Sequence, residues 1–386
     1  MNSHQPTILI LGGGVGGVVA ARTLQVRAGG RARIVVIDKS PLHVYAPGFL
    51  HLMLAKRAGE SLTRPLQRLA RKGVEVVQEE VVKIEPEQRT VLTTAREHFF
   101  DYLVIALGAE FAPERIPGLK ENGFNLYERR SVERLRDALG AFSGGKLAIV
   151  ITALPFKCPA APYEAAFLLD EYFQNKKLRH RTEIHIYTPE LLPLPAAGTD
   201  IGRRVREMLK AGHIEFHPET ILQSVDAGKK ELVLNGGPPA PFDLLVYVPP
   251  HQGPKAVRAS GMGNEAGYLP VDRATLQTKY DRIYAIGDCT FIPLVTGKPL
   301  PKAGVFAHFE AEVVARNIAA ELRGEKPRAV YDGRAYCFLE TGWRKAGFAS
   351  GNFYADPAPK VTMRAPSRFL YMGKQLFEKY WWWKWF

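Results

Sequence analysis

The sequence predicts an α/β fold made of two Rossmann-like dinucleotide-binding units, followed by a separate C-terminal segment. Three observations indicate this fold. An apolar run at 8–11 leads into a glycine-rich turn and a helical pattern. A second strand–helix–strand unit begins at 147–152, and a strand at 283–286 precedes a long helical pattern at 303–322. Buried strands that alternate with helices are typical of parallel sheets covered by helices.

The first unit carries the glycine pattern of a nucleotide-binding turn. Gly12, Gly14 and Gly17 match GxGxxG between the first predicted strand and helix, and Asp38 ends the next predicted strand. The first glycine permits a tight turn, the second lets the backbone approach a pyrophosphate, and the third lets helix and strand pack closely. The helix N-terminus favours phosphate, and Asp38 is placed to accept hydrogen bonds from a ribose. The pattern therefore indicates a dinucleotide site rather than a purely structural turn.

The order of the predicted elements divides the chain into three parts. Residues 1–108 and 270–325 are assigned to a discontinuous first domain, because the long helical pattern returns to it. A second Rossmann-like domain is assigned to 109–269, and a C-terminal segment to 326–386. The other predicted strands are 34–37, 74–77, 81–84, 90–93, 102–105, 184–187, 214–216, 231–234 and 244–248, and the other predicted helices are 163–173 and 200–210.

Composition excludes several classes of protein. With 46% hydrophobic and 24% charged residues among 386, the chain is globular rather than disordered or fibrous. Three cysteines are too few for a disulfide-stapled secreted domain, and the short polar N-terminus lacks signal-peptide features, so a cytosolic start is expected. The net charge of +13 attracts anionic surfaces, but no motif points to nucleic acid. The ten histidines show no metal-ligand spacing, so no metal site is predicted.

The second unit lacks a glycine turn. The apolar run at 147–152 is followed by Ala153-Leu154-Pro155-Phe156-Lys157-Cys158-Pro159, which contains no glycine and is stiffened by two prolines. A pyrophosphate would meet side chains where it needs bare backbone. The sequence therefore argues against a pyridine nucleotide as the electron donor.

Two later segments resemble those of two-dinucleotide-domain flavoproteins of the disulfide-reductase type. The segment 101–108, with Ala106 and Gly108, resembles their apolar strand followed by Ala-x-Gly. The segment 282–288, with Gly287 and Asp288, resembles their second FAD signature. This resemblance implies FAD as the cofactor, with Asp288 on its ribityl chain. The alternative for Asp288 is a turn residue after a strand.

The segment 157–170 resembles the cysteine loop and helix of sulfide:quinone oxidoreductases, and of the flavoprotein subunit of flavocytochrome c sulfide dehydrogenase. The likeness runs over nearly the whole chain and includes 301–307, which resembles the helix under the flavin pyrimidine, and 336–338. It implies that Cys158 and Cys337 form a redox pair beside the flavin. No cysteine follows Asp38 where flavocytochrome relatives attach FAD, so the FAD is expected to be noncovalent.

The chemistry implied by this resemblance needs two sulfurs. Hydrosulfide opens a disulfide or bridging sulfur to give a persulfide and a thiolate, whose pKa we expect below the free value of about 8.5. Lys302 and Lys157 are candidate positive groups for that thiolate, and Glu164 is a candidate proton acceptor. The alternatives are buried, inert cysteines and a glutamate that simply lies on a helix face.

Two other residues concern the same chemistry. Many sulfide:quinone oxidoreductases have a third cysteine before the second unit, and Tyr127 stands at that position here. This difference leaves the growth of the sulfur chain in doubt. Cys289, which follows Asp288, is interpreted as a packing residue.

The C-terminal residues 366–386 carry four of the five tryptophans and predict an amphipathic helix. On one face lie Phe369, Met372, Leu376, Tyr380 and Trp383, widened by Leu370, Phe377 and Trp381. Charged residues make a spanning helix costly, so a helix lying in an anionic membrane surface fits better. The alternative is a helix docked on the core or in a dimer interface. We expect a peripheral membrane protein on the cytoplasmic face. The resemblance implies that quinone reaches the flavin through such a surface, past Phe338 and Phe348.

The function predicted from the resemblance is oxidation of sulfide to sulfur or polysulfide, with electrons passed through FAD to membrane quinone. The alternatives are a sulfide dehydrogenase with a cytochrome acceptor, a type II NADH:quinone oxidoreductase, and a non-enzymatic sulfur-carrier or binding module. The missing glycine turn counts against the NADH enzyme, and the aromatic helix counts against the cytochrome-linked one. Assembly into a homo-oligomer is left open.

Overall fold

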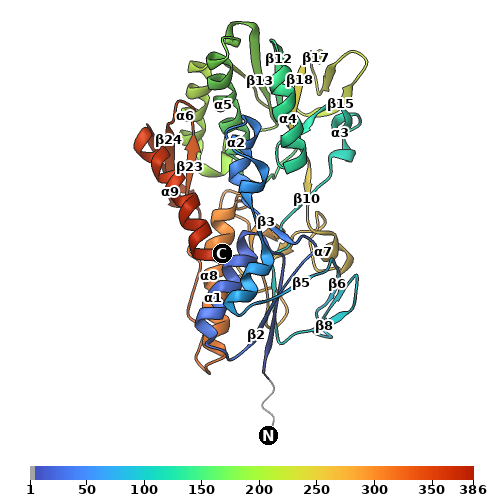
Figure 1. Ribbon diagram of the computed structural model, residues 1–386, viewed down its shortest axis with the longest axis vertical. Helices are drawn as coiled ribbons and strands as arrows, with labels where there is room; N and C mark the ends of the chain where they lie inside the picture. The colour runs from blue at the N-terminus through green and yellow to red at the C-terminus, as the bar shows by residue number, and fades with distance from the viewer. Residues whose placement is uncertain (1–4) are drawn as a thin grey trace.

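The computed structural model describes residues 5–386 (Figure 1). Its first sheet is five-stranded and parallel. The strand order is β21-β9-β1-β2-β5. Ile8 of the central strand pairs with Ile34 on one side and Tyr102 on the other. The strands are β1 (Thr7–Leu11), β2 (Arg33–Asp38), β5 (Glu75–Gln78), β9 (Tyr102–Ile105) and β21 (Ile283–Ala285).

Both faces of this sheet are covered, which explains why its strands read as continuous apolar runs. Ile8 and Ile10 face the helices α1 (Val15–Ala28) and α8 (Gly304–Glu321), which pack side by side. Leu9 and Leu11 face a second cluster, formed with a three-stranded antiparallel sheet and a short helix. These elements are β6 (Val81–Glu85), β7 (Thr90–Thr93), β8 (Glu97–Phe99) and α7 (Lys255–Ala259).

The second sheet is also five-stranded and parallel, in the order β11-β18-β12-β13-β14. Its strands are β11 (Phe124–Asn125), β12 (Gly145–Ile151), β13 (Thr182–Tyr187), β14 (Ile214–His217) and β18 (Leu244–Val248). One face packs on α4 (Arg129–Ala141), α5 (Ala161–Asn175) and α6 (Thr199–Ala211). The other face packs on the antiparallel strands β15 (Leu222–Asp226), β16 (Glu231–Leu234) and β17 (Ala240–Pro241). The predicted α/β class with two Rossmann-like units is confirmed.

Short elements connect the two units. The strands β10 (Glu110–Phe111) and β19 (His251–Gln252) pair antiparallel between the two sheets. Near the first sheet, β3 (Leu42–Val44) pairs with β4 (Thr63–Pro65), and β20 (Leu269–Pro270) pairs with β22 (Thr290–Phe291). The helix α2 (Phe49–Met53) reaches the second unit and contacts α4 and α5, whereas α3 (Leu119–Asn122) lies near β15.

The C-terminal segment forms a third sheet that the sequence did not predict. Three antiparallel strands, β23 (Arg334–Glu340), β24 (Ala346–Asn352) and β25 (Lys360–Ser367), are followed by the helix α9 (Arg368–Trp385). The sheet contacts α5 and α6 of the second unit and α8 of the first. Figure 1 shows α9 running along this sheet toward the first unit, where the chain ends.

The helix α9 agrees with the helix predicted for the aromatic end of the chain. Ser367 caps it, because its hydroxyl oxygen accepts a 3.2 Å hydrogen bond from the amide of Leu370. The predicted outward side chains are indeed exposed, namely Phe369, Met372, Leu376, Tyr380 and Trp383. Trp381, which was expected to widen this outward face, is instead 3% exposed, because the last turns of α9 leave the sheet and pack on α1 and α8. No helix among the described residues is long and apolar enough to cross a membrane.

Candidate active site

The glycine turn after β1 leaves one stretch of bare backbone open. A side chain on Gly12 would lie 2.3 Å from the carbonyl oxygen of Ala106, and one on Gly17 would overlap the carbonyl of Gly12. Gly12 also has φ of +103°, which suits glycine. A Cβ atom added at Gly14, the N-cap residue of α1, would have no protein atom within 4 Å. Two glycines are therefore required by packing, and the third offers the uncrowded helix N-terminus that a pyrophosphate needs.

The other predicted cofactor residues lie at the same edge of the first sheet, because each follows the carboxyl end of a parallel strand. Asp38 ends β2, and its two carboxylate oxygens accept hydrogen bonds from the amides of Gly13 (2.6 Å) and Ser40 (2.7 Å). Gly108, with φ of +70°, follows β9 and has open space around it. After β21 come Gly287, whose amide donates to Glu310 at 2.6 Å, and Asp288. This arrangement fits a dinucleotide.

Lys302 lies between this edge and the cysteine loop. Its ammonium donates to the carbonyl oxygens of Asp288 (2.7 Å) and Thr290 (2.9 Å) and sits 3.7 Å from the ring centre of Tyr268. Burial lowers the pKa of this ammonium to about 8. The backbone of Lys302 also contacts the cysteine loop, because its carbonyl oxygen accepts a 2.6 Å hydrogen bond from the Cys158 amide.

The loop after β12 contains no glycine, and side chains fill the space around its backbone. Phe156 is buried in it, and Cys158 has φ of +48°. The carbonyl oxygen of Cys158 accepts hydrogen bonds from the Tyr127 hydroxyl at 3.2 Å and from the Ala161 amide at 2.9 Å. The ammonium of Lys157 lies 4.5 Å from the ring centre of Phe111, and burial lowers its pKa although Asp288 and Cys158 oppose this shift. The aromatic packing leaves no bare backbone of the kind that Gly14 offers in the first unit.

The two cysteine-bearing segments lie against each other. Cys337 is exposed on β23, opposite Ala349 of β24. The carboxylate of Glu164, in the first turn of α5, accepts a 2.7 Å hydrogen bond from the backbone amide of Glu340 on β23. Glu164 follows Cys158 by six residues and Glu340 follows Cys337 by three. A direct bond therefore joins the surroundings of two thiols that are far apart in the sequence.

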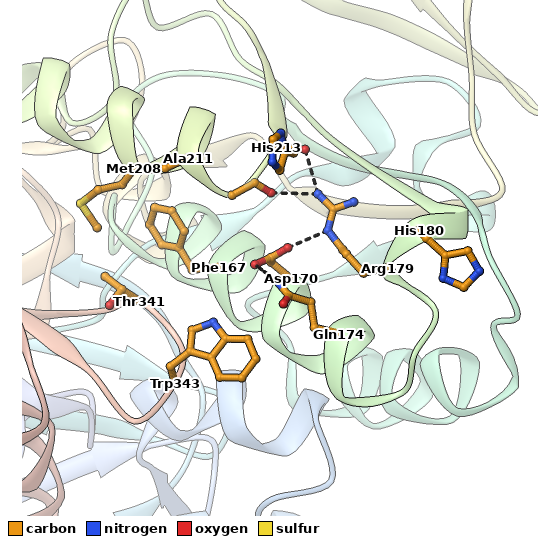
Figure 2. A pocket seen from close by; sticks show the side chains of 11 residues that line it. Phe167, Asp170, Gln174, Arg179, His180, Met208, Ala211, His213, Thr341 and Trp343 are labelled. Atoms are coloured by element: carbon orange, nitrogen blue, oxygen red, sulfur yellow. Dashed lines mark hydrogen bonds and ion pairs between the residues drawn. The ribbon is translucent and has the colours of Figure 1, made fainter.

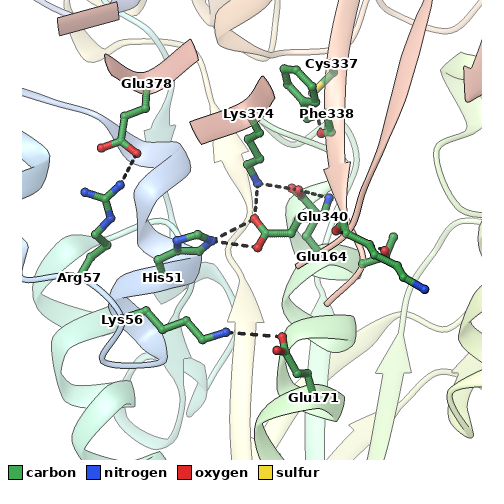
Figure 3. A network of polar contacts seen from close by, with 12 residues as sticks. His51, Lys56, Arg57, Glu164, Glu171, Cys337, Phe338, Glu340, Lys374 and Glu378 are labelled. Atoms are coloured by element: carbon green, nitrogen blue, oxygen red, sulfur yellow. Dashed lines mark hydrogen bonds and ion pairs between the residues drawn. The ribbon is translucent and has the colours of Figure 1, made fainter. Parts of the chain in front are cut away.

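A buried charge network surrounds this junction (Figure 3). The ammonium of Lys374, from α9, lies 3.2 Å from a carboxylate oxygen of Glu164 and 2.7 Å from one of Glu340. The ring nitrogen Nε2 of His51, from α2, lies 3.0 Å from both carboxylate oxygens of Glu340. Burial alone would raise the pKa of the Glu340 carboxyl, but His51 and Lys374 outweigh it and hold this pKa at about 2. Burial disfavours the Lys374 ammonium, yet the two carboxylates raise its pKa.

The thiols are not activated in the way the sequence suggested. Burial, the Glu164 carboxylate and Cys337 raise the pKa of the Cys158 thiol, and Lys374 is the cation that opposes them. Surrounding protein atoms and Glu164 raise the pKa of the Cys337 thiol to about 12, although part of that residue is exposed. Both shifts are opposite in direction to the lowered thiol pKa that we expected, because the thiols are surrounded by protein atoms and a carboxylate lies close.

Three residues of this site were not found from the sequence. These residues are Lys374, His51 and Glu340. They lie on separate elements, so no local sequence pattern connects them with one another or with Glu164. Cys289 behaves as interpreted, because it is fully buried and its thiol donates to backbone carbonyls. Among residues 5–386, no group of three or more His, Cys, Asp or Glu side chains could hold a metal ion.

A cleft of about 830 Å³ lies between α5, α6 and the turn after β23 (Figure 2). Its central charge is Arg179, which bonds to Asp170 at 2.6 Å and to the carbonyl oxygens of Thr182, Gly212 and His213. Because these donors are already used within the fold, the cleft offers little for an anionic ligand.

Comparison with known proteins identifies the family. The profile described as pyridine nucleotide-disulphide oxidoreductase matches residues 6–311. The chain belongs to this family. Membership, together with the relatives below, implies a flavin cofactor, and the geometry of the glycine turn agrees with it.

The relatives of this chain confirm its resemblance to sulfide:quinone oxidoreductases. Mitochondrial sulfide:quinone oxidoreductase of Mus musculus is 26% identical over 369 residues, which cover 91% of this chain and 79% of the mouse protein. The X-ray structure of sulfide:quinone oxidoreductase from Aquifex aeolicus matches with a TM-score of 0.89 and 24% identity, over 98% of this chain and 91% of that one. Type II NADH:quinone oxidoreductase of Staphylococcus aureus is 27% identical over a shorter 350 residues, 84% of this chain and 85% of the relative.

Proposed function

We propose that this protein oxidises sulfide with a Cys158–Cys337 redox pair and passes the electrons through noncovalent FAD to a membrane quinone. The observation that carries the proposal is the 2.7 Å bond between Glu164 and the Glu340 amide, which joins the two cysteine segments. The names of the relatives, sulfide:quinone oxidoreductases, supply the substrate and the acceptor. The crowded loop after β12 supports the same choice over an enzyme that takes electrons from NADH.

In the proposed reaction, a disulfide between the two cysteines is opened and sulfide is oxidised by two electrons. Hydrosulfide attacks one sulfur of a Cys158–Cys337 disulfide, so that the S–S bond breaks, a persulfide forms on one cysteine and the other leaves as a thiolate. Overall, hydrosulfide loses two electrons and one proton to become zero-valent sulfur. Quinone takes up two electrons and two protons to become quinol, and the second of these protons comes from water. Bound flavin supplies the two-electron relay between these half-reactions. The sulfur is released as elemental sulfur or polysulfide.

Named residues of the chain serve defined steps in this proposal. Glu164 is the proton acceptor for incoming sulfide, because its buried carboxylate lies in the first turn of the helix that follows Cys158. Lys374 holds that carboxylate in place and is the nearby positive charge when a thiolate forms at Cys158. Gly12, Gly14, Gly17 and Asp38 hold the FAD pyrophosphate and ribose. Asp288 and the buried Lys302 line the side of the site toward the flavin.

The exposed side of α9 supports a peripheral association with an anionic membrane surface. Five apolar or aromatic side chains stand out from it in a row, and nearby Phe338 and Phe348 pack edge to face at 5.1 Å between ring centres. An isolated row of large apolar side chains on a soluble surface is typical of an interaction site. We propose that quinone arrives past these aromatic rings. The cytoplasmic side of the membrane stays a prediction from the sequence.

The proposed electron donor can be tested directly. When the purified flavin-bound protein is mixed anaerobically with sulfide, the visible flavin absorbance is expected to bleach, and added quinone is expected to restore it. The same mixing with NADH should leave the absorbance unchanged, because the second unit has no glycine turn for the pyrophosphate. Bleaching by NADH but not by sulfide would favour the type II NADH:quinone oxidoreductase reading instead.

The proposed membrane surface gives a second prediction. Replacing Leu376, which is exposed on α9, with glutamate is expected to weaken sedimentation with vesicles that contain anionic lipid, because it puts a charge into the apolar row. Each basic residue near such a surface contributes about 1 kcal/mol, so binding should also fall as salt is raised. Val26→Glu, at an exposed apolar position on α1, serves as the matched control. Equal binding of both variants and the parent would contradict the assignment.

A further inference from the structure

The last turns of α9 pack on the helix that begins at the glycine turn. Trp381 and Trp385 are 3% and 4% exposed and belong to one apolar cluster with Val18 and Val19 of α1 and with residues of α8. Figure 1 shows the C-terminus beside α1 and α8. The end of the chain is therefore part of the structure around the proposed FAD site, although it is about 370 residues away in sequence.

A buried histidine connects this aromatic end to the turn. His43, on β3, is 1% exposed, and its ring centre lies 5.8 Å from that of Trp381, nearly parallel, and 5.1 Å from that of Phe386. Its ring nitrogen Nδ1 lies 2.9 Å from the carbonyl oxygen of Gly13. Burial lowers the pKa of His43 to about 4, so the ring is neutral at pH 7. Because the Gly13 carbonyl can only accept, Nδ1 carries the proton and donates it to this bond.

Gly13 is thereby held from both sides. Its carbonyl accepts from His43, and its amide donates to the Asp38 carboxylate at 2.6 Å. These two bonds fix the peptide groups next to Gly14, whose surroundings are open toward the proposed pyrophosphate. The orientation of a short glycine segment would otherwise be costly to fix, because glycine loses more conformational freedom than other residues.

We propose that the aromatic end of α9 is a positioning element for FAD. Trp381 and Phe386 pack against the His43 ring and fix its position, so that Nδ1 donates a hydrogen bond to the Gly13 carbonyl. This hydrogen bond keeps the dinucleotide turn in the conformation that binds FAD. This inference rests on the proposed FAD site and adds to it a contribution from the end of the chain. It also gives two tryptophans of α9 different roles. Trp381 supports the FAD site, whereas Trp383, which is 78% exposed, belongs to the proposed membrane surface.

Alanine variants of Trp381 and Trp383, which both lie on α9, test these two roles. For full-length protein freed of flavin, Trp381→Ala is expected to raise the FAD dissociation constant about tenfold, which is the loss of about one hydrogen bond's worth of binding. It should also speed amide hydrogen exchange in the peptide covering residues 12–17. Trp383→Ala should leave both measurements unchanged and weaken vesicle binding instead. Equal FAD affinity of the parent and Trp381→Ala would overturn the inference.

A third variant keeps the test decisive if Trp381→Ala fails to fold. His43→Phe retains an aromatic ring between the tail and the turn but removes the donor to Gly13, so FAD affinity is expected to fall by a similar factor. If the folded His43→Phe variant binds FAD as the parent does, the inference is wrong. If the parent itself binds no FAD, the proposed function fails at its cofactor, which is a different outcome from equal binding by parent and variants.

Discussion

Replacing Cys158 with serine is expected to slow sulfide-driven flavin reduction by about a thousandfold or more, the usual scale for loss of a group that forms a covalent intermediate. A serine hydroxyl cannot form the disulfide that hydrosulfide is proposed to open. Cys337→Ser should have the same effect, and the double variant should be hardly slower than either single one, because the two sulfurs act as one unit. Rapid mixing with sulfide, monitored by flavin absorbance, gives these rates.

The third cysteine supplies the control. Cys289 is fully buried, and its thiol donates to the carbonyl oxygens of Ile105 and Ile286, which a serine hydroxyl can also reach. Cys289→Ser is therefore expected to reduce its flavin with sulfide at the parent rate. If all three serine variants reacted alike, the Cys158–Cys337 pair would be excluded. Normal flavin spectra of the variants would show that the cofactor site is intact.

The parts of the site predicted from the sequence share one property, which is that each depends on neighbours in the chain. The GxGxxG turn, Asp38 at the end of a strand and the glycine-free loop around Cys158 are local patterns with a known physical requirement. The parallel order of the strands then brings their carboxyl ends to one edge without further information. The α/β class followed from the same alternation of buried strands and helices.

The parts that were missed depend on contacts between distant segments. In the sheet of β23, β24 and β25, the strand Ala346–Asn352 consists mainly of small residues and lacks a clear alternation of apolar and polar side chains. Lys374 is indistinguishable from a solvated helix residue until Glu164 and Glu340 are seen on either side of it. The direction of the thiol pKa shifts was also missed, because it depends mainly on how far the surrounding protein buries the two thiols.

Lys374 carries the second large prediction. Replacing it with methionine keeps the length of the side chain but leaves the carboxylates of Glu164 and Glu340 buried without their shared cation. Removal of one partner from a buried ion pair is expected to cost about 3 kcal/mol or more, measured as the free energy of unfolding in urea. Lys379→Met, at an exposed position on the same helix, should change this free energy by less than about 0.5 kcal/mol.

Lys374→Met should also change how the free energy of unfolding depends on pH. In the parent, the pKa of Glu340 is about 2, below its ordinary value of 4.5, so its stabilising contribution is complete above pH 4.5 and is lost as the pH falls through about 2. Without the Lys374 ammonium this pKa rises, and acid unfolding is expected to begin at a higher pH. Lys374→Arg, which retains the positive charge, should restore most of the acid stability.

A loss of stability in Lys374→Met would not show that Lys374 supports the sulfur chemistry, so the rate of sulfide-driven flavin reduction must also be measured. Lys374 opposes the burial and the carboxylate that raise the pKa of the Cys158 thiol. In the methionine variant that pKa rises further, and the pH profile of sulfide-driven flavin reduction is expected to move to higher pH, whereas arginine should move it back. A profile that stays in place while stability falls would mean that Lys374 only holds α9 against α5 and β23. A shifted profile would make α9 an element that supports the cysteine site through Lys374 and presents the proposed membrane surface on its other side.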